Sequence, residues 1–326
     1  MFIFDAHSDI WMKTVEERRL GNEDYFMNTH YPKLQKGKVS GGIFVVYSRT
    51  DSKVDTVRYF WKEVGGVMKE ISYLKETGAP IDFVKSYEEI EEAIDKGHFF
   101  ALMGIEGLKG IEGDTEQIRT LYNLGFRHAS LTWNEENHLA AGAAIEDENR
   151  GVTVLGEKAV KLMDELGMIL DVSHLNERSF WDITEIWKKP IVASHSNSKT
   201  LLYHRRNITD EQAKAIAKSG GVIGVNVCGE FLHKDKPSIN CYLDNIDHFA
   251  NIAGLESVGI GFDFCDFLRS GSLGPDEQIE RDVEGLKDIS DGAAVLEGLK
   301  ARGYSEEDIK KIAHGNFMRV IKELIS

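Results

Sequence analysis

The chain has few of the residues that would place it among secreted, disulfide-stabilised or linker-rich proteins. Its 326 residues include 3 cysteines and 5 prolines. An odd number of cysteines without C-x-x-C spacing argues against a disulfide framework and favours a reducing compartment. So few prolines leave little room for a proline-rich linker between domains.

The sequence also lacks a long apolar run and an excess of basic residues. No run approaches the ~20 apolar residues that a membrane helix needs, and the start MFIFDAHSD has no basic segment leading into a longer apolar stretch, as a signal peptide would. The net charge is −15, which argues against nucleic acid as a partner because phosphate binding relies on clustered Lys and Arg. We therefore expect a cytoplasmic protein that binds neither membrane nor nucleic acid.

What the sequence does contain is an alternation of short apolar runs with longer amphipathic segments. Eight runs rich in Ile, Val, Leu, Phe and Met are typical of buried strands: 2–6, 42–47, 99–104, 127–132, 168–172, 190–194, 221–227 and 257–262. Helical patterns follow at 56–77, 114–124, 153–167, 177–187, 209–219, 239–253 and 275–289, with a tail at 292–302 and 305–324. This order predicts one α/β domain over 1–326, a (β/α)8 TIM-type barrel with a C-terminal helical tail; a doubly wound sheet is the alternative.

Five potential metal ligands stand at the ends of these runs. His7 and Asp9 end the first run, Glu106 follows the third, and His174 and His195 follow the fifth and sixth. Side chains two apart in a strand point to the same side, and adjacent strands lie about 4.8 Å apart, so each pair can meet at one ion. Singly, each residue is equally typical of a helix cap, a core histidine or a solvated loop. Together they predict a hydrolase with two divalent metals, for which imidazole and carboxylate suit zinc.

Asp263 ends the eighth run, which barrel closure places beside the first run and its two ligands. There the carboxylate can bind metal or move the proton of a metal-bound water, or it can simply cap the following loop. Two connections, 133–151 and 265–274, are long for simple turns. Since loops after barrel strands build active sites, we expect them to form its walls or lids.

Several segments match one known family in order and spacing. They are D-A-H-S-D at 5–9, G-I-E-G at 104–107, D-V-S-H at 171–174, S-H-S-N at 194–197, R-R-N-I-T-D at 205–210, G-I-G-F-D-F at 259–264, and the C-terminal segments 285–290 and 315–320. Over essentially its whole length the chain resembles the membrane dipeptidase (renal dipeptidase) family of zinc peptidases, in the amidohydrolase-like superfamily.

The resemblance implies a ligand set and a reaction. His7 and Asp9 would hold one Zn²⁺, His174 and His195 the other, and Glu106 would bridge the two. The implied activity is hydrolysis of small dipeptides by a hydroxide between the metals, extending to dipeptides with a C-terminal D-residue. The family also suggests a homodimer.

The resemblance assigns further roles and shows one departure. Asp263 matches the family's catalytic acid/base, and Arg206 matches the arginine that contacts a substrate carboxylate, a task that suits a guanidinium fork. Its neighbour Arg205 is the alternative, and a surface salt bridge is the ordinary interpretation of either. Trp133 stands where the family often has a histidine, and its indole N–H can donate one hydrogen bond but carries no charge. His138, five residues on, is the candidate substitute.

Three functions stay open at this point. A dipeptidase would need a group for the substrate ammonium, for which Glu230 or a backbone carbonyl of 133–151 are candidates. The alternative is an amidohydrolase acting on a non-peptide amide, lactone or N-acyl amino acid, which the Trp133 departure favours. The third is a catalytically inactive barrel acting as a binding module.

Overall fold

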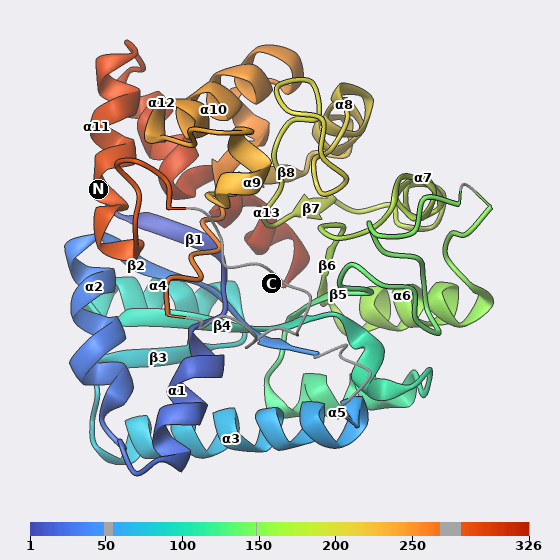
Figure 1. Ribbon diagram of the computed structural model, residues 1–326. Coiled ribbons are helices and arrows are strands. Elements are labelled where there is room, and N and C mark those ends of the chain that lie inside the picture. Colours follow the sequence, from blue (N-terminus) through green and yellow to red (C-terminus); the bar gives the residue numbers. More distant parts are fainter. Residues whose placement is uncertain (49–54, 148, 268–281, 326) are drawn as a thin grey trace.

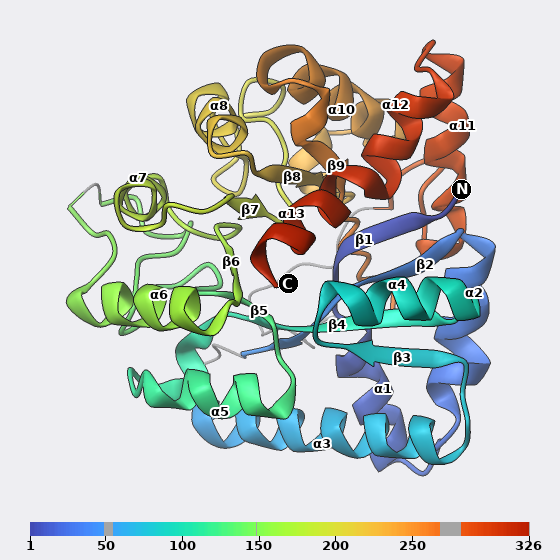
Figure 2. The same cartoon turned by 180° about the vertical axis from the view of Figure 1, so that it is seen from behind.

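Eight parallel strands form a nearly closed barrel with the helices outside it (Figures 1 and 2). The computed structural model describes residues 1–48, 55–147, 149–267 and 282–325. In their order around the barrel the strands are β1 (Ile3–Ser8), β2 (Val39–Tyr47), β4 (Phe99–Glu106), β5 (His128–Ser130), β6 (Ile169–Asp171), β7 (Val192–Ala193), β8 (Val222–Val225) and β9 (Val258–Ile260). Each predicted apolar run overlaps one of them, so the predicted barrel is confirmed.

A ninth strand, β3 (Ile81–Val84), was not predicted. It pairs with the first half of β4, Ile81 opposite Phe99, on the edge whose second half pairs with β5. The strand has only four residues, of which the two central ones are half-buried. So short a segment, with an aspartate inside it, lacks the apolar run by which the other strands are recognised.

Thirteen α-helices lie within the described ranges. They are α1 (Ile10–Arg19), α2 (Tyr31–Lys36), α3 (Thr56–Glu76), α4 (Tyr87–Lys96), α5 (Glu116–Leu124), α6 (Val154–Leu166), α7 (Glu177–Ile186), α8 (Asp210–Lys218), α9 (Gly229–Leu232), α10 (Ile239–Ala253), α11 (Ala293–Ala301), α12 (Glu306–Lys310) and α13 (Asn316–Leu324). The predicted helices at 56–77, 114–124, 153–167, 177–187, 209–219 and 239–253 and in the tail are confirmed. Helices α1, α2, α4 and α9 were not predicted. In α1 the buried Lys13 and Arg18 are polar residues that interrupt the apolar stripe on which prediction relies.

The helix predicted at 275–289 is wrong in its described part. Residues 275–281 lie outside the described ranges, and 282–288 form bridges and turns instead of a helix. The backbone N–H of Glu284 donates to the Pro237 carbonyl, and the Glu284 carbonyl accepts from Ile239 at 2.8 Å. The segment therefore forms backbone hydrogen bonds with the start of α10, in place of the internal hydrogen bonds of a helix.

Local cap chemistry fixes several helix ends. A reciprocal capping box between Thr209 and Gln212 begins α8, and Ser305 makes the equivalent box at α12. Gly125 and Gly167 end α5 and α6 with φ of 107° and 70°, the left-handed conformation that glycine adopts without a Cβ clash. These boundaries agree with the ends of the helical patterns predicted at 114–124, 153–167, 209–219 and 305–324.

The C-terminal tail closes the amino end of the barrel. A π-helical turn at Lys311–Gly315 leads into α13, which Figure 2 shows over this end. The His314 ring lies 3.0 Å from the Phe2 carbonyl, and the Asn316 amide donates to the carbonyls of Leu255 and Val258, both at 2.7 Å. These contacts cover the starts of β1 and β9 and leave the opposite, carboxyl end of the barrel uncovered by the tail.

A buried aspartate links β1 and β9, the first and last strands, at the seam where the barrel closes. Asp5 accepts hydrogen bonds from the backbone N–H of Phe262 at 2.8 Å and of His7 at 3.3 Å. Burial raises the pKa of Asp5 to about 7, although both backbone hydrogen bonds oppose the shift. One residue further, the N–H of Asp263 donates to the His7 carbonyl at 3.1 Å. The seam thus brings the end of β1 next to Asp263.

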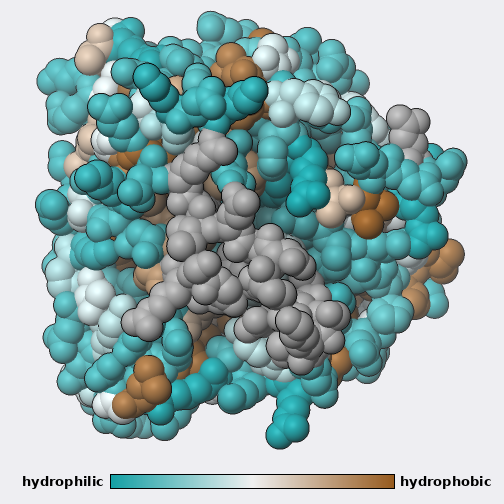
Figure 3. Space-filling view, viewed as in Figure 1, coloured by the Kyte–Doolittle hydropathy of each residue, from teal (hydrophilic) through white to brown (hydrophobic). Residues whose placement is uncertain are grey.

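The molecular face drawn in Figure 3 is mainly hydrophilic, and its coloured hydrophobic residues stand singly or in small groups. Such scattered apolar residues are ordinary for a globular protein. Within the described ranges, no helix combines the length and apolar character needed to cross a membrane.

Candidate metal centre

The five predicted ligands meet at the carboxyl end of the barrel. His7 lies near the end of β1, Asp9 begins α1, Glu106 is the last residue of β4, and His174 and His195 follow β6 and β7. All five are at most 5% exposed. Burying two carboxylates and three imidazoles side by side is unfavourable unless something compensates their charge and their unused hydrogen-bonding capacity.

Glu106 stands between the two pairs. Its Oε1 lies 3.4 Å from His7 Nε2, 2.8 Å from His174 Nε2 and 3.5 Å from His195 Nε2. The donor atoms form two sets that share Glu106, each within 4.8 Å. We call His7, Asp9 and Glu106 the first donor set, and Glu106, His174 and His195 the second donor set.

In the first donor set, negative charge dominates. Burial alone would lower the pKa of His7, but Glu106, Asp9 and Asp263 outweigh it and raise the pKa to about 10. The His7 Nε2 and the Asp9 Oδ1 are buried without a hydrogen-bond partner. A field that so strongly favours a proton on His7 also favours a divalent cation, which would satisfy both orphaned atoms.

The second donor set has the opposite character. Burial lowers the pKa of His174 and His195 well below the usual range, with Arg206 and His7 adding to the effect. Both rings are therefore neutral, the form of imidazole that ligates metal. Their Nε2 atoms lie 2.8 Å apart, so two lone pairs converge on one place beside Glu106.

A buried network orients His195. Ser194 Oγ donates to Asp171 Oδ2 at 2.5 Å, and it therefore accepts from His195 Nδ1 at 2.7 Å. This leaves the lone pair of His195 on Nε2, facing the cluster. His128 Nε2 lies 3.2 Å from the same carboxylate, and despite burial His128 and Ser194 hold the pKa of Asp171 below its usual range. Sequence reasoning missed this support, although Asp171 stands in the quoted segment D-V-S-H.

The loop after β5 forms a wall of the cluster, as predicted for 133–151; most of the other predicted loop, residues 268–274, lies outside the described ranges. Asn134 Oδ1 lies 2.9 Å from His174 Nδ1, an arrangement that fixes the lone pair on Nε2. The Trp133 ring stacks on His174 with centroids 5.8 Å apart. His138 is exposed, and its neighbours in the described chain include Thr153 and Gly113. The structure thus brings Trp133, but not His138, to the cluster.

Asp263 lies beside the first donor set. Its Oδ1 is 3.9 Å from His7 Nε2, and its Oδ2 accepts from the Asn226 amide at 2.9 Å. Burial raises its pKa to about 6; Asp9 adds to this, while His7 and Arg206 oppose it. Asp263 and His174 have φ of 59° and 71°, a left-handed backbone that costs energy in residues other than glycine and clusters at functional sites.

The structure distinguishes between the two candidate arginines. Arg206 is 4% exposed, and its guanidinium donates to the His195 carbonyl at 3.2 Å. Its Nε is buried without a hydrogen-bond partner. Burial lowers the pKa of Arg206, while Asp263 and Glu106 favour its charged form. Arg205 is exposed, so Arg206 is the arginine that faces the cluster.

The site consists of two donor sets that share one carboxylate, and a buried acid and arginine lie next to them at the carboxyl end of the barrel. This combination defines a class, the metal-dependent hydrolases of (β/α)8 architecture. The sequence profile described as "Membrane dipeptidase (Peptidase family M19)" matches residues 1–325. The chain belongs to this family, and the prediction of a metallo-dipeptidase is confirmed at that level.

Named relatives agree with this assignment. Dipeptidase aclJ of Aspergillus oryzae is 26% identical over 339 residues, covering 98% of this chain and 77% of the relative. Two solved structures share the fold with a TM-score of 0.85. One, titled dipeptidase AC, a metallo peptidase of family M19, is 22% identical and covers 100% of this chain and 99% of its own. The other, a metallo peptidase from Rhodobacter sphaeroides liganded with a phosphinate mimic of L-Ala-D-Ala, is 20% identical and covers 99% of each chain.

Proposed function

We propose that residues 1–326 act as one dinuclear zinc dipeptidase. The observation that carries the proposal is the shared carboxylate, Glu106 Oε1 within 3.5 Å of His7, His174 and His195. The first donor set would hold one Zn²⁺ and the second donor set the other. Bound zinc would supply a hydroxide nucleophile by lowering the pKa of a water and would polarise the scissile carbonyl.

In this proposal Asp263 moves the proton. Because Asn226 binds Oδ2, the other oxygen, Oδ1, is directed toward His7 and the first donor set. Oδ1 takes the proton of the attacking water and then delivers it to the departing amine. A carboxyl pKa near 6 suits a group that must accept and release a proton at neutral pH.

Arg206 would bind the C-terminal carboxylate of the substrate, which explains a limit to very short peptides. The unpartnered Nε gives its guanidinium a further donor for a bidentate bond. The substrate ammonium would meet Glu230 or a backbone carbonyl of 133–151. The mimic of L-Ala-D-Ala bound by the Rhodobacter sphaeroides relative supports including dipeptides with a C-terminal D-residue.

We also propose a cytoplasmic homodimer. No disulfide joins Cys228, Cys241 and Cys265, which fits a reducing compartment. The dimer rests on the family resemblance. Sedimentation of the full chain at micromolar concentration would test it, and a single species of about 36.7 kDa would contradict it.

A dipeptide panel tests the function. Chelator-stripped protein, with and without added Zn²⁺, is given L-L and L-D dipeptides together with their N-acetylated and C-amidated forms. Zinc-dependent cleavage that requires both free termini is the expected result. Arg206→Lys should raise KM for the free carboxylate more than for the C-amide, because an ammonium lacks the fork geometry.

One observation favours a second candidate. Trp133 stacks on His174 at the place where the family often has a histidine, so a cationic donor for the oxyanion is replaced by an indole. An amidohydrolase of a non-peptide amide, lactone or N-acyl amino acid would keep both donor sets and need no ammonium site. Cleavage of N-acetylated but not of free dipeptides would favour it.

A further inference from the structure

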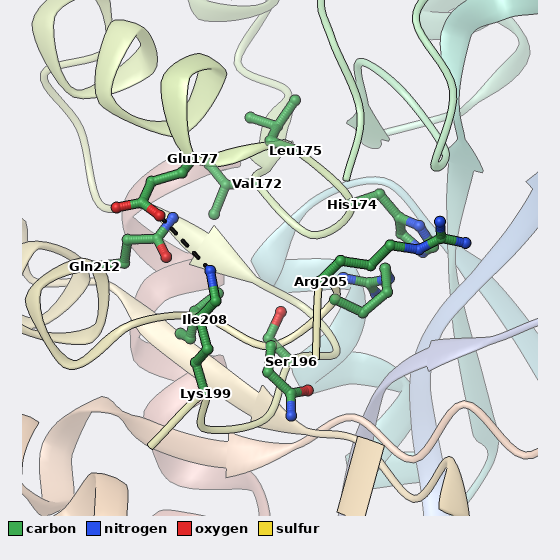
Figure 4. A pocket seen from close by; sticks show the side chains of 11 residues that line it. Val172, His174, Leu175, Glu177, Ser196, Lys199, Arg205, Ile208 and Gln212 are labelled. Carbon is green, nitrogen blue, oxygen red and sulfur yellow. Dashed lines mark ion pairs between the residues drawn. The ribbon is translucent and has the colours of Figure 1, made fainter. Parts of the chain in front are cut away.

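A polar pocket lies next to the second donor set, between the turn after β6 and the loop after β7. Its enclosed space is about 30 Å³, or about 340 Å³ when the part open to solvent is counted, and its walls come from residues 172–177 and 196–212. Figure 4 shows His174 and Arg205 at one end and Lys199, Glu177 and Gln212 at the other. The pocket therefore leads from a metal-ligating histidine to a lysine.

Three buried residues of the pocket wall have hydrogen-bonding capacity that the described chain does not use. Ser196, Arg206 and Asn207 are at most 4% exposed. Ser196 Oγ, Arg206 Nε and Asn207 Oδ1 are buried and have no hydrogen-bond partner. Because buried polar groups are nearly always paired, these three atoms call for a partner, which water or a polar ligand in the pocket would supply.

Positive charge predominates in the pocket although the whole chain has a net charge of −15. Its wall contains Lys199, Arg205 and Arg206 against a single carboxylate, Glu177. The Lys199 Nζ lies 3.7 Å from Glu177 Oε2, too far for a direct hydrogen bond. The lysine is only 25% exposed and so has donors left for an anion.

The loop that carries these groups is held in place before any ligand arrives. Ser198 N–H donates to Asn245 Oδ1 at 2.8 Å, and the Asn207 amide donates to the carbonyls of Leu202 and Phe231 at 2.9 and 3.0 Å. Apolar Val172, Leu175 and Ile208 also line the pocket and suit the methylene groups of a short side chain. A preformed wall loses little entropy on binding.

We propose that this pocket is a second anion subsite that selects dipeptides whose C-terminal residue is acidic. This proposal rests on the proposed dipeptidase function. The α-carboxylate of the substrate would bind Arg206, and its side-chain carboxylate would lie between Ser196 and Lys199. Arg205 adds positive charge at the end of the pocket near His174. The C-terminal residue would thus be aspartate or glutamate, of either configuration.

The test compares isosteric substrates on the zinc-loaded full chain. Ala-Glu and Ala-Gln differ in one charge, as do Ala-Asp and Ala-Asn, and each pair is measured in L-L and L-D form. The better acidic substrate should exceed its amide in kcat/KM by about tenfold or more, mainly through KM, as expected for a hydrogen bond to a charged group. Glutamate should inhibit more strongly than glutamine as a product.

Variants then locate the effect. Lys199→Met keeps the apolar stem and should reduce the acid-to-amide ratio to near one. Glu177→Gln removes the opposing carboxylate and should raise the ratio by about two- to fivefold. Lys188→Met is the control, because Lys188 is exposed just after the end of α7 and lies outside the pocket wall, and it should leave the ratio unchanged.

The outcomes separate this proposal from the function on which it rests. Cleavage of amide and acidic dipeptides at equal rates would overturn the acidic subsite and leave the dipeptidase standing. An acidic preference that survives Lys199→Met in protein with wild-type melting temperature would also overturn it. Failure to cleave any dipeptide would overturn both.

Discussion

The two donor sets contain the same residue types and have opposite electrostatic character. In the first donor set, carboxylates raise the pKa of His7 to about 10. In the second donor set, burial keeps His174 and His195 neutral. The comparison teaches that the first donor set attracts a cation by charge, whereas the second presents lone pairs that Ser194 and Asn134 orient. We therefore expect two metal affinities with different dependence on pH and on neighbouring residues.

The largest effect should come from removing what the donor sets share. Glu106→Gln replaces the carboxylate that lies within 3.5 Å of three histidines with a neutral amide. Activity should fall by at least ~10³-fold and metal content should drop below two per chain, since both sites lose their common anion. Elemental analysis of dialysed protein and initial rates measure both. The control is Glu116→Gln, an exposed residue of α5; full activity with two metals in Glu106→Gln would contradict the account.

The next effect concerns Asp263, which belongs to neither donor set and which we propose as the group that moves the proton. Asp263→Asn should lower kcat by about 10²- to 10⁴-fold with both metals retained. In the wild type the carboxylate must be ionised to accept a proton, so kcat/KM should fall as pH drops below about 6, the pKa that burial gives Asp263. Bound cations favour the ionised carboxylate, so they can move this fall in kcat/KM only to lower pH. If the residual activity of Asp263→Asn showed the same fall in kcat/KM at low pH, that fall would belong to another group.

Asp171→Asn should affect the two donor sets unequally. Because Asp171 supports His195 through Ser194, the weaker carboxamide acceptor should loosen metal in the second donor set by about 10- to 100-fold. The first donor set should be affected less, because Ser194 Oγ lies 3.5 Å from His7 Nδ1 but 2.7 Å from His195 Nδ1. Competition with a chromogenic chelator resolves the two steps, and equal weakening of both would remove the distinction between them.

The same variant tests a link to stability. The pKa of Asp171 is depressed in the folded protein from the ordinary value of 3.8. Its contribution to the free energy of unfolding is therefore complete above that value and is lost as pH falls below it. Metal-free wild-type protein should lose stability between about pH 4 and 2 more steeply than Asp171→Asn. Urea titrations at several pH values give the comparison.

The smallest effect should come from Trp133, whose ring stacks on His174 of the second donor set. Trp133→Phe keeps an aromatic ring on His174 and removes the indole N–H. A fall in kcat of about three- to tenfold is expected if that N–H donates to the oxyanion. An unchanged kcat would show that the indole N–H is not used as a donor. The control for loss of a tryptophan is Trp61→Phe, at a residue of α3.

Much of the fold, and the clustering of the five candidate ligands, was predictable because both depend on strand ends. The apolar runs that precede His174 and His195 are buried strands, and parallel strands bring their carboxyl ends together whatever the loops do. The short strand β3 and the helix α1 escaped prediction because half-buried or charged residues break their patterns.

The supporting contacts were not predictable in the same way. Ser194 and Asn134 are polar residues of common types, and only the folded backbone shows that they orient His195 and His174. The choice between Arg205 and Arg206 likewise depends on which guanidinium the loop turns inward. His138 is close to Trp133 in sequence, yet the loop turns it to the surface.

The most direct test titrates metal-free protein with Zn²⁺ while one dipeptide is hydrolysed and bound metal is counted. The account predicts two binding steps of different affinity, with activity rising mainly in the second, because both donor sets that share Glu106 must be filled. Full activity after one equivalent would contradict the two-metal account. Two tightly bound equivalents without hydrolysis of any dipeptide would contradict the dipeptidase itself.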